Sequence, residues 1–124
     1  MPAYDANFNP PAPVADVTVS HPVTGAESDA LRGKFDTGAD VTVIPEQWVA
    51  QLNLTAKGHI WTRGYEGNYS QRSVYYVRIT IEGFPVASVR CIATARGDVL
   101  VGRNVLNRFF ITLDGRRQTF ALSE

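Results

Sequence analysis

The stretch GKFDTGADVTVIP, residues Gly33 to Pro45, places one aspartate, Asp36, directly before Thr-Gly and inside an otherwise apolar run. A carboxylate buried among apolar residues is costly unless it is hydrogen-bonded. Gly38 allows the backbone to come close and offer an N–H, and Thr37 supplies a hydroxyl. An ordinary Asx turn also fits this tripeptide, so the stretch alone leaves a structural and a chemical role for Asp36 open.

A second segment, VLVGRNVL from Val99 to Leu106, has the features of a partner for this loop. Gly102 allows another backbone segment to pass close by, and Arg103 is a cation in an apolar neighbourhood. Asp40, four residues after Asp36, is the natural carboxylate for this cation. The sequence therefore predicts an Arg103–Asp40 ion pair that ties the two segments together.

A glycine-bearing tip from Gly64 to Asn68 lies between two strand-like runs. A hairpin of this kind can close over a cleft, as lid loops do in many enzymes. We expect Trp48 and Trp61 to be core or half-buried packing residues, with a pocket-lining role as the alternative.

The composition limits the classes of partner. The chain has 124 residues, of which 44% are hydrophobic, and this suits one domain with a single core. Its 12 basic and 12 acidic residues give a net charge of zero, so we expect neither nucleic acid nor a membrane surface as partner. The two histidines are isolated and show no ligand spacing, so no metal site is expected.

The single cysteine, Cys91, excludes an intramolecular disulfide, and its place in the apolar run VRCIAT indicates a buried, inert thiol. No signal peptide is visible at the N-terminus, and no apolar run approaches the ~20 residues that span a bilayer. These features predict a cytoplasmic location.

Strand-like runs dominate the chain. Residues 1–13 are proline-rich and are expected to form an extended or disordered arm, ahead of one domain over residues 14–124. In VYYVRITI, alternate residues from Tyr75 to Ile81 share one apolar face of a strand. The other expected elements are a hairpin over 14–35, a strand over 41–45, a short helix from Pro45 to Leu54, two strands within 57–81 around the glycine-bearing tip, strands over 84–94 and from Val99, a short helix around Asn104–Arg108, and a final hairpin with Asp114-Gly115 as a two-residue type I′ turn. The expected fold class is mainly β, a small closed β-barrel with one or two short helices.

FDTGADVTVIP followed by LVGRNVL resembles the two motifs of retropepsins, the single-lobed aspartic proteases of retroviruses and their cellular and bacterial relatives. The resemblance runs from Val14 to Leu122 and implies an acid-protease barrel with one lobe per chain. A full hairpin follows GRNVLNRF, and this layout is more similar to the cellular and bacterial relatives than to the viral enzymes.

The resemblance also implies a role for each matching residue. Asp36 matches the catalytic aspartate. Thr37 and Gly38 support the active-site loop, with the Thr37 hydroxyl bonding across a dimer axis, and Asp40 and Arg103 match an ion pair that steadies this loop. The implied substrate-binding residues are Ala39, Asp40, Val41, Tyr65, Glu66, Gly67 and Leu100, with residues 65–68 at the tip of a flap.

One aspartate per chain is half of what this chemistry needs. Hydrolysis uses one ionised carboxylate, which takes a proton from water, and one protonated carboxylate, which donates a hydrogen bond to the scissile carbonyl. The sequence holds no second Asp-Ser-Gly or Asp-Thr-Gly, so a C2 homodimer must bring Asp36 and its symmetry mate together. The expected activity is cleavage of an extended peptide or protein substrate without a metal or cofactor, favoured at mildly acidic pH.

Two other functions stay open. The chain can be a peptide-binding or scaffold module that keeps the retropepsin fold without turnover, or a structural β-barrel with no site. The intact Asp-Thr-Gly and the predicted Arg103–Asp40 pair favour the protease. The dimer interface also stays open, because terminal strands build much of it in the viral enzymes and this chain ends differently, in a hairpin that is itself a candidate.

Overall fold

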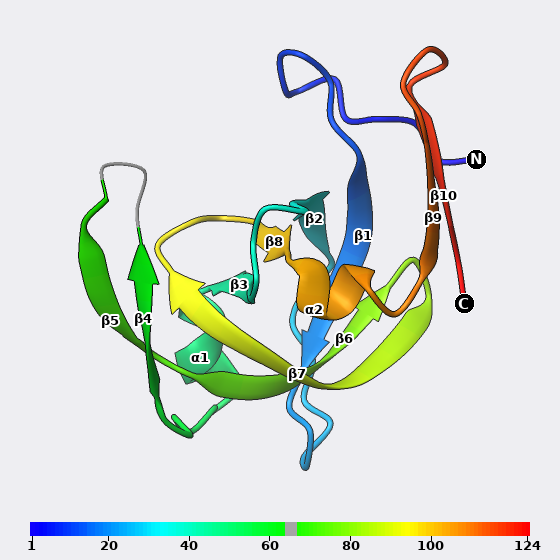
Figure 1. Ribbon diagram of the computed structural model, residues 1–124. Helices are drawn as coiled ribbons and strands as arrows, with labels where there is room; N and C mark the ends of the chain where they lie inside the picture. The colour runs from blue at the N-terminus through cyan, green and yellow to red at the C-terminus, as the bar shows by residue number, and fades with distance from the viewer. Residues whose placement is uncertain (64–66) are drawn as a thin grey trace.

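The computed structural model describes residues 1–63 and 67–124, and Figure 1 shows its elements coloured along the chain. In chain order, they are β1 (Val14–Ser20), β2 (Leu31–Phe35), β3 (Thr42–Pro45), α1 (Gln47–Gln51), β4 (His59–Arg63), β5 (Tyr69–Ser73), β6 (Tyr75–Ile81), β7 (Phe84–Thr94), β8 (Val99–Val101), α2 (Arg103–Leu106), β9 (Phe110–Asp114) and β10 (Thr119–Ser123). Neither helix in these two ranges is long and apolar enough to cross a membrane.

Six strands form a closed barrel in the order β1-β2-β8-β3-β7-β6, and β6 pairs back to β1. Alternation along the strands explains which residues fill it. In β6, Val77, Ile79 and Ile81 are fully buried, whereas Tyr76 and Arg78, which point to the other face, are exposed. The expected fold class, mainly β with a small closed barrel and short helices, is confirmed.

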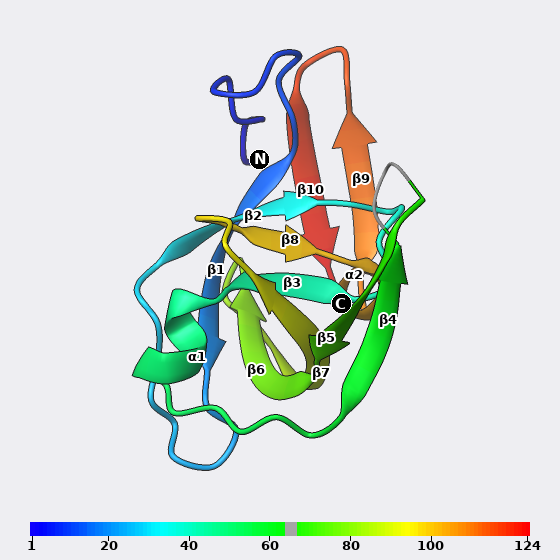
Figure 2. The same ribbon diagram turned by 90° about the vertical axis from the view of Figure 1, so that its left-hand side faces the viewer.

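The middle of the barrel joins segments that are far apart in the sequence (Figure 2). β8 lies between β2 and β3, running parallel to β2 with Gly33 opposite Val99, and antiparallel to β3 with Val43 opposite Leu100. β3 in turn runs parallel to β7. The turn from β2 to β3 therefore stands beside the chain that leaves β8, at one end of these strands.

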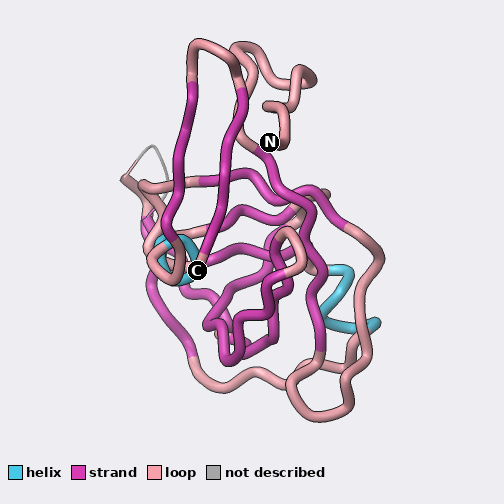
Figure 3. The backbone as a smooth tube through the Cα atoms, turned by 90° about the vertical axis from the view of Figure 1, so that its right-hand side faces the viewer, coloured by secondary structure: helices cyan, strands magenta, loops and turns pink. Residues whose placement is uncertain are grey.

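The C-terminal hairpin of β9 and β10 packs on the barrel and meets the N-terminal arm (Figure 3). Phe120 of β10 is fully buried, and its ring packs edge-on against Phe35 with the ring centroids 5.2 Å apart. The Phe120 N–H donates to the Pro2 carbonyl at 2.9 Å, and the Tyr4 N–H donates to the Gln118 carbonyl at 2.7 Å. The first residues of the chain thus lie along the edge of β10 that faces away from β9.

The loop between β9 and β10 is longer than the two-residue turn expected at Asp114-Gly115. Asp114 pairs with Thr119, so residues 115–118 form the loop and Asp114-Gly115 is not a two-residue turn. The Asp114 carboxylate accepts a hydrogen bond from the Arg117 N–H at 3.0 Å, and Gln118 takes the left-handed backbone with φ of 54°. The aspartate side chain shapes this loop, so the type I′ expectation was wrong.

Two further boundaries differ from expectation. Residues 69–81 form two strands, because the exposed β5 pairs with β4 outside the barrel while the alternating β6 enters it. Pro45 ends β3, opposite Thr94, and α1 begins at Gln47 with Glu46 at its N-cap. The buried pairing of β3 with β7 therefore extends through the proline that was expected to open the helix.

Cys91 is a free, buried thiol on β7, as expected, and burial raises its pKa to about 12. We predict that iodoacetamide does not alkylate native Cys91 at about pH 8, because the thiolate is the reactive form and burial keeps the thiol neutral there. Unfolding in urea should expose the thiol and return its pKa to the ordinary range, so that labelling becomes rapid. Mass spectrometry of both samples checks this, and equal labelling rates in the two would contradict it.

Candidate active site

The loop after β2 holds Asp36 by backbone hydrogen bonds on three sides. The Asp36 N–H donates to the Val101 carbonyl at 2.9 Å, and its own carbonyl accepts from the Ala39 N–H at 3.2 Å. The Gly38 N–H donates to Asp36 Oδ1 at 2.9 Å. The side chain is half-buried, so one carboxylate oxygen is satisfied by the loop while the group keeps access to a partner.

Arg103, the first residue of α2, binds this loop through its backbone and its side chain. Its backbone N–H donates to the Ala39 carbonyl at 2.9 Å, and Nη1 donates to the Thr37 carbonyl at 2.7 Å. Nη2 pairs with the Asp40 carboxylate. The structure therefore brings together Asp40 and Arg103, and it adds a contact to the Thr37 backbone that the sequence did not indicate.

Asn104 is a structural residue of the site to which the sequence analysis assigned no role. Its Oδ1 accepts from the Thr42 N–H at 3.1 Å and from the Thr42 hydroxyl at 2.8 Å, and its Nδ2 donates to the Arg90 carbonyl at 2.6 Å. The Thr42 hydroxyl also accepts from the Gly102 N–H at 3.1 Å. One amide thus joins β3, β7 and the start of α2. An amide at the start of a helix, directly after Gly-Arg, is the signal from which this role can be recognised.

A cavity of about 380 Å³ lies between the Asp36 loop and the β4–β5 hairpin. Its lining combines apolar and aromatic side chains with the charged residues Asp40 and Arg63. The residues around it are Gly38, Ala39, Asp40, Val41, Val43, Ile60, Trp61, Thr62, Arg63, Tyr69 and Ile92. Trp61 is 68% exposed at this cavity, so the packing role expected for it was wrong, whereas Trp48 is buried as expected.

The expected flap falls at the free end of β4 and β5. Gly67 has φ of 82°, a left-handed backbone that glycine adopts without strain. The Arg63 guanidinium lies 5.8 Å from the centre of the Tyr69 ring, within the range of a cation–π contact across the hairpin. Tyr65 and Glu66 lie outside the described residues. Leu100 lies in β8 and is not among the residues that line the cavity.

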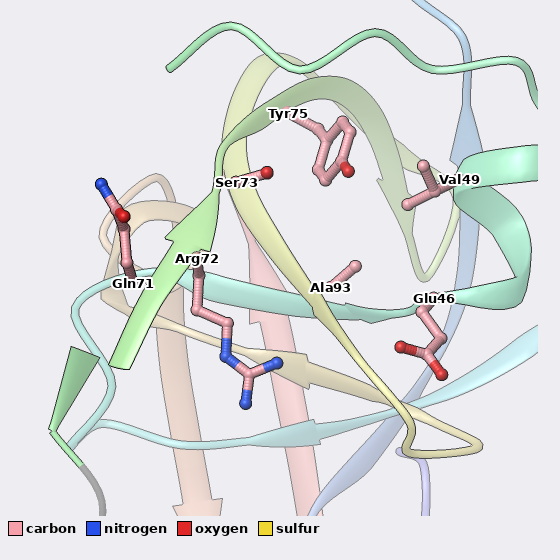
Figure 4. Close-up of a pocket in the computed structure, with 7 residues that line it drawn as sticks. All are labelled: Glu46, Val49, Gln71, Arg72, Ser73, Tyr75 and Ala93. Carbon is pink, nitrogen blue, oxygen red and sulfur yellow. The ribbon is translucent and has the colours of Figure 1, made fainter. Parts of the chain in front are cut away.

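A second cavity, of about 410 Å³, lies on the side of β5 toward α1 (Figure 4). It is lined by Glu46, Val49, Gln71, Arg72, Ser73, Tyr75 and Ala93. None of these residues belongs to the Asp36 loop, so the slightly smaller cavity is the one that can present a substrate to Asp36. Within residues 1–63 and 67–124, no group of three or more histidine, cysteine or acidic side chains is placed to hold a metal ion.

Comparison with known proteins finds similarity to an aspartyl protease family and to retroviral proteases. An aspartyl protease family model matches residues 17–105. The protease of simian foamy virus (mac) is similar with a TM-score of 0.57 and 18% identity, over 77% of this chain and 92% of that chain. The EIAV protease complexed with the inhibitor HBY-793 has a TM-score of 0.56 and 20% identity, over 78% of this chain and 86% of that chain.

A foamy viral protease–reverse transcriptase in complex with an RNA/DNA hybrid has a TM-score of 0.58 and 22% identity, over 78% of this chain and 12% of that chain. No curated protein sequence gives a significant match. The matched structures, at these identities, establish a common fold, the barrel of the retroviral proteases.

We predict that Gly102→Ala destabilises the protein by about 1–3 kcal/mol, as overpacking does in a tight core. A Cβ at this position would stand 2.8 Å from the Val41 carbonyl carbon and 3.0 Å from the Thr42 nitrogen, and both are backbone atoms. Gly97→Ala is the matched control, because a Cβ there meets nothing within 4 Å. Urea unfolding measures both variants, and equal midpoints would contradict the close approach.

Proposed function

Because this chain belongs to the aspartyl protease family, we propose that it is an aspartic endopeptidase that hydrolyses peptide bonds as a homodimer. One observation carries the proposal: the Asp36 carboxylate accepts a hydrogen bond from the Gly38 N–H, in a loop that borders the cavity beside the β4–β5 hairpin. Each chain contributes one such loop, and two of them supply the pair of carboxylates that the reaction needs.

The reaction follows from two carboxylates about 3 Å apart, which cannot both ionise and therefore share one proton. The ionised Asp36 takes a proton from a water molecule that attacks the scissile carbonyl carbon. The protonated Asp36 of the other chain donates a hydrogen bond to the carbonyl oxygen and stabilises the charge that develops there. The C–N bond then breaks as the amine accepts a proton, and the dyad regains its shared proton.

Loop rigidity supports this chemistry. Arg103 fixes the loop through hydrogen bonds to the Thr37 and Ala39 carbonyls, so the carboxylate is held in place before substrate binds. The Thr37 side chain is exposed, and we assign its hydroxyl to a hydrogen bond across the dimer axis. This contact would hold the two Asp36 residues at the separation that sharing a proton requires.

The substrate is an extended peptide segment that lies between the Asp36 loop and the β4–β5 hairpin. Val41, Val43, Ile60 and Ile92 give the cavity an apolar floor, which favours an apolar substrate side chain. Ala39, Asp40 and Gly67 are proposed to contact the substrate backbone, and Leu100 is proposed to lie beside the loop. A module that only binds peptides would use the same cavity, and it differs by leaving the bound peptide uncut.

We predict that Asp36→Asn lowers the rate of peptide cleavage by roughly 10³-fold or more, because the amide can neither accept the proton of water nor share one with its mate. Asp29→Asn is the matched control, since Asp29 is an exposed carboxylate away from the loop, between β1 and β2. Cleavage of a peptide library, followed by mass spectrometry, measures both variants, and thermal unfolding verifies that each is folded. Cleavage by Asp36→Asn at the wild-type rate would rule out the mechanism.

Mixing experiments test whether two chains share the site. Well above the dimer Kd, adding an equal amount of Asp36→Asn chain to wild-type chain should reduce the activity to about one half, because random pairing converts wild-type dimers into mixed ones. A site contained in one chain would leave the activity unchanged. Adding the Asp29→Asn chain instead should raise the activity, which controls for dilution and exchange.

A further inference from the structure

The cavity of about 410 Å³ on the α1 side of the β4–β5 hairpin has no part in the proposed hydrolysis. Its volume lies within the roughly 300–1,000 Å³ that small-ligand pockets occupy in proteins. β5 supplies one wall, the start of α1 supplies the opposite wall, and β6 and β7 supply the floor (Figure 4). It is therefore a second candidate binding site, and the hairpin separates it from the cavity beside Asp36.

The floor of this cavity is apolar. Val49, Tyr75 and Ala93 are half-buried, and all three pack against the hydrophobic core. Figure 4 shows their side chains pointing toward one another from α1, β6 and β7. A ligand that covers their exposed parts removes apolar surface from water, and this stabilises the complex. The floor therefore favours a ligand with an aliphatic or aromatic group.

Two opposite charges stand at the rim of the cavity. Arg72 on β5 and Glu46 ahead of α1 are both exposed, and Figure 4 shows the guanidinium and the carboxylate on either side of Ala93. Within residues 1–63 and 67–124, neither side chain forms an ion pair with the other or with a further residue. Glu46 is the N-cap of α1, but its carboxylate makes no capping hydrogen bond. The rim can therefore bind a ligand that carries one anionic and one cationic group.

We propose that this cavity binds a short apolar peptide with free ends, its terminal carboxylate on Arg72 and its terminal ammonium group on Glu46. The planar guanidinium donates two parallel N–H bonds to a carboxylate, and the Glu46 carboxylate accepts from an ammonium group. The Ser73 hydroxyl points into the cavity in Figure 4 and can bond to the peptide group between the two ends. The apolar side chains of the ligand lie on the apolar floor.

The β4–β5 hairpin borders both cavities. Residues 71–73 line this one, whereas Ile60, Trp61 and Tyr69 line the one beside the Asp36 loop. The hairpin is a two-stranded sheet outside the barrel, so a ligand between β5 and α1 restrains its position. Cleavage of a peptide bond creates a new carboxylate and a new ammonium group, so the ligand has the chemistry of a product. We expect short products to change the cleavage rate without competing with substrate, and this regulatory role rests on the proposed function.

Titration with the dipeptide Leu-Leu tests the site without hydrolysis. Calorimetry should show that Glu46→Gln and Arg72→Gln each raise the Kd roughly ten-fold or more. Acetylating the ammonium group of the ligand should weaken binding to the wild type by a similar factor and should not weaken binding to Glu46→Gln further, because both changes remove the same contact. Amidating the carboxylate should behave likewise toward Arg72→Gln. The matched controls, Glu27→Gln and Arg116→Gln, change exposed residues in the β1–β2 and β9–β10 loops and should bind like the wild type.

Methyl NMR locates the ligand. Leu-Leu should shift the signals of Val49 and Ala93 and leave those of Val41 and Val43, which line the cavity beside Asp36. Absence of binding, shifts confined to Val41 and Val43, or a Kd that neither rim substitution changes would overturn the site.

Peptide cleavage by the same samples separates the two proposals. A chain that binds Leu-Leu in this cavity but cleaves no peptide contradicts the proposed function and leaves the site standing. An active protease that does not bind Leu-Leu contradicts the site alone, and a cleavage rate that saturating Leu-Leu leaves unchanged overturns the regulatory role.

Discussion

The close approach of Gly102 to the backbone of Val41 and Thr42 is the constraint on which the rest of the structure depends. A Cβ at this point would stand 2.8 Å from the Val41 carbonyl carbon, so only glycine allows the two segments to cross at this distance. The crossing lets β8 lie between β2 and β3, and it brings the Arg103 N–H to the Ala39 carbonyl. Closure of the barrel and placement of the Asp36 loop therefore have one common cause.

The polar contacts around this crossing differ in how much they stabilise the fold. The Arg103 and Asp40 side chains are 44% and 81% exposed, and exposed ion pairs contribute about 0–1 kcal/mol. Thr42 is fully buried, and a buried group that loses its hydrogen bond costs about 1–3 kcal/mol. The amide of Asn104 satisfies both the N–H and the hydroxyl of Thr42. The position of the loop thus depends more on Asn104 than on the ion pair that is more conspicuous in the sequence.

Local patterns predicted the parts of the structure that local physics determines. Alternation from Tyr75 to Ile81 reports which residues of a strand are buried, and this held in β6. Asp36, Gly102 and Arg103 were identifiable because an acid within an apolar run, a close backbone approach and an isolated cation each require a particular residue type. The role of Asn104, the exposure of Trp61 and the split between β5 and β6 depend on which distant segments meet. Local periodicity in the sequence does not indicate which distant segments come into contact. The Asp114 loop was mispredicted because a side-chain hydrogen bond outweighed the turn preference of Asp-Gly.

Under the proposed function, a single Asp36 per chain makes activity depend on assembly. If the site forms only between two copies, its concentration below the dimer Kd rises with the square of the chain concentration, since monomers carry no complete dyad. Under the proposed function, dilution below the dimer Kd is therefore enough to abolish hydrolysis, because it separates the two Asp36 residues.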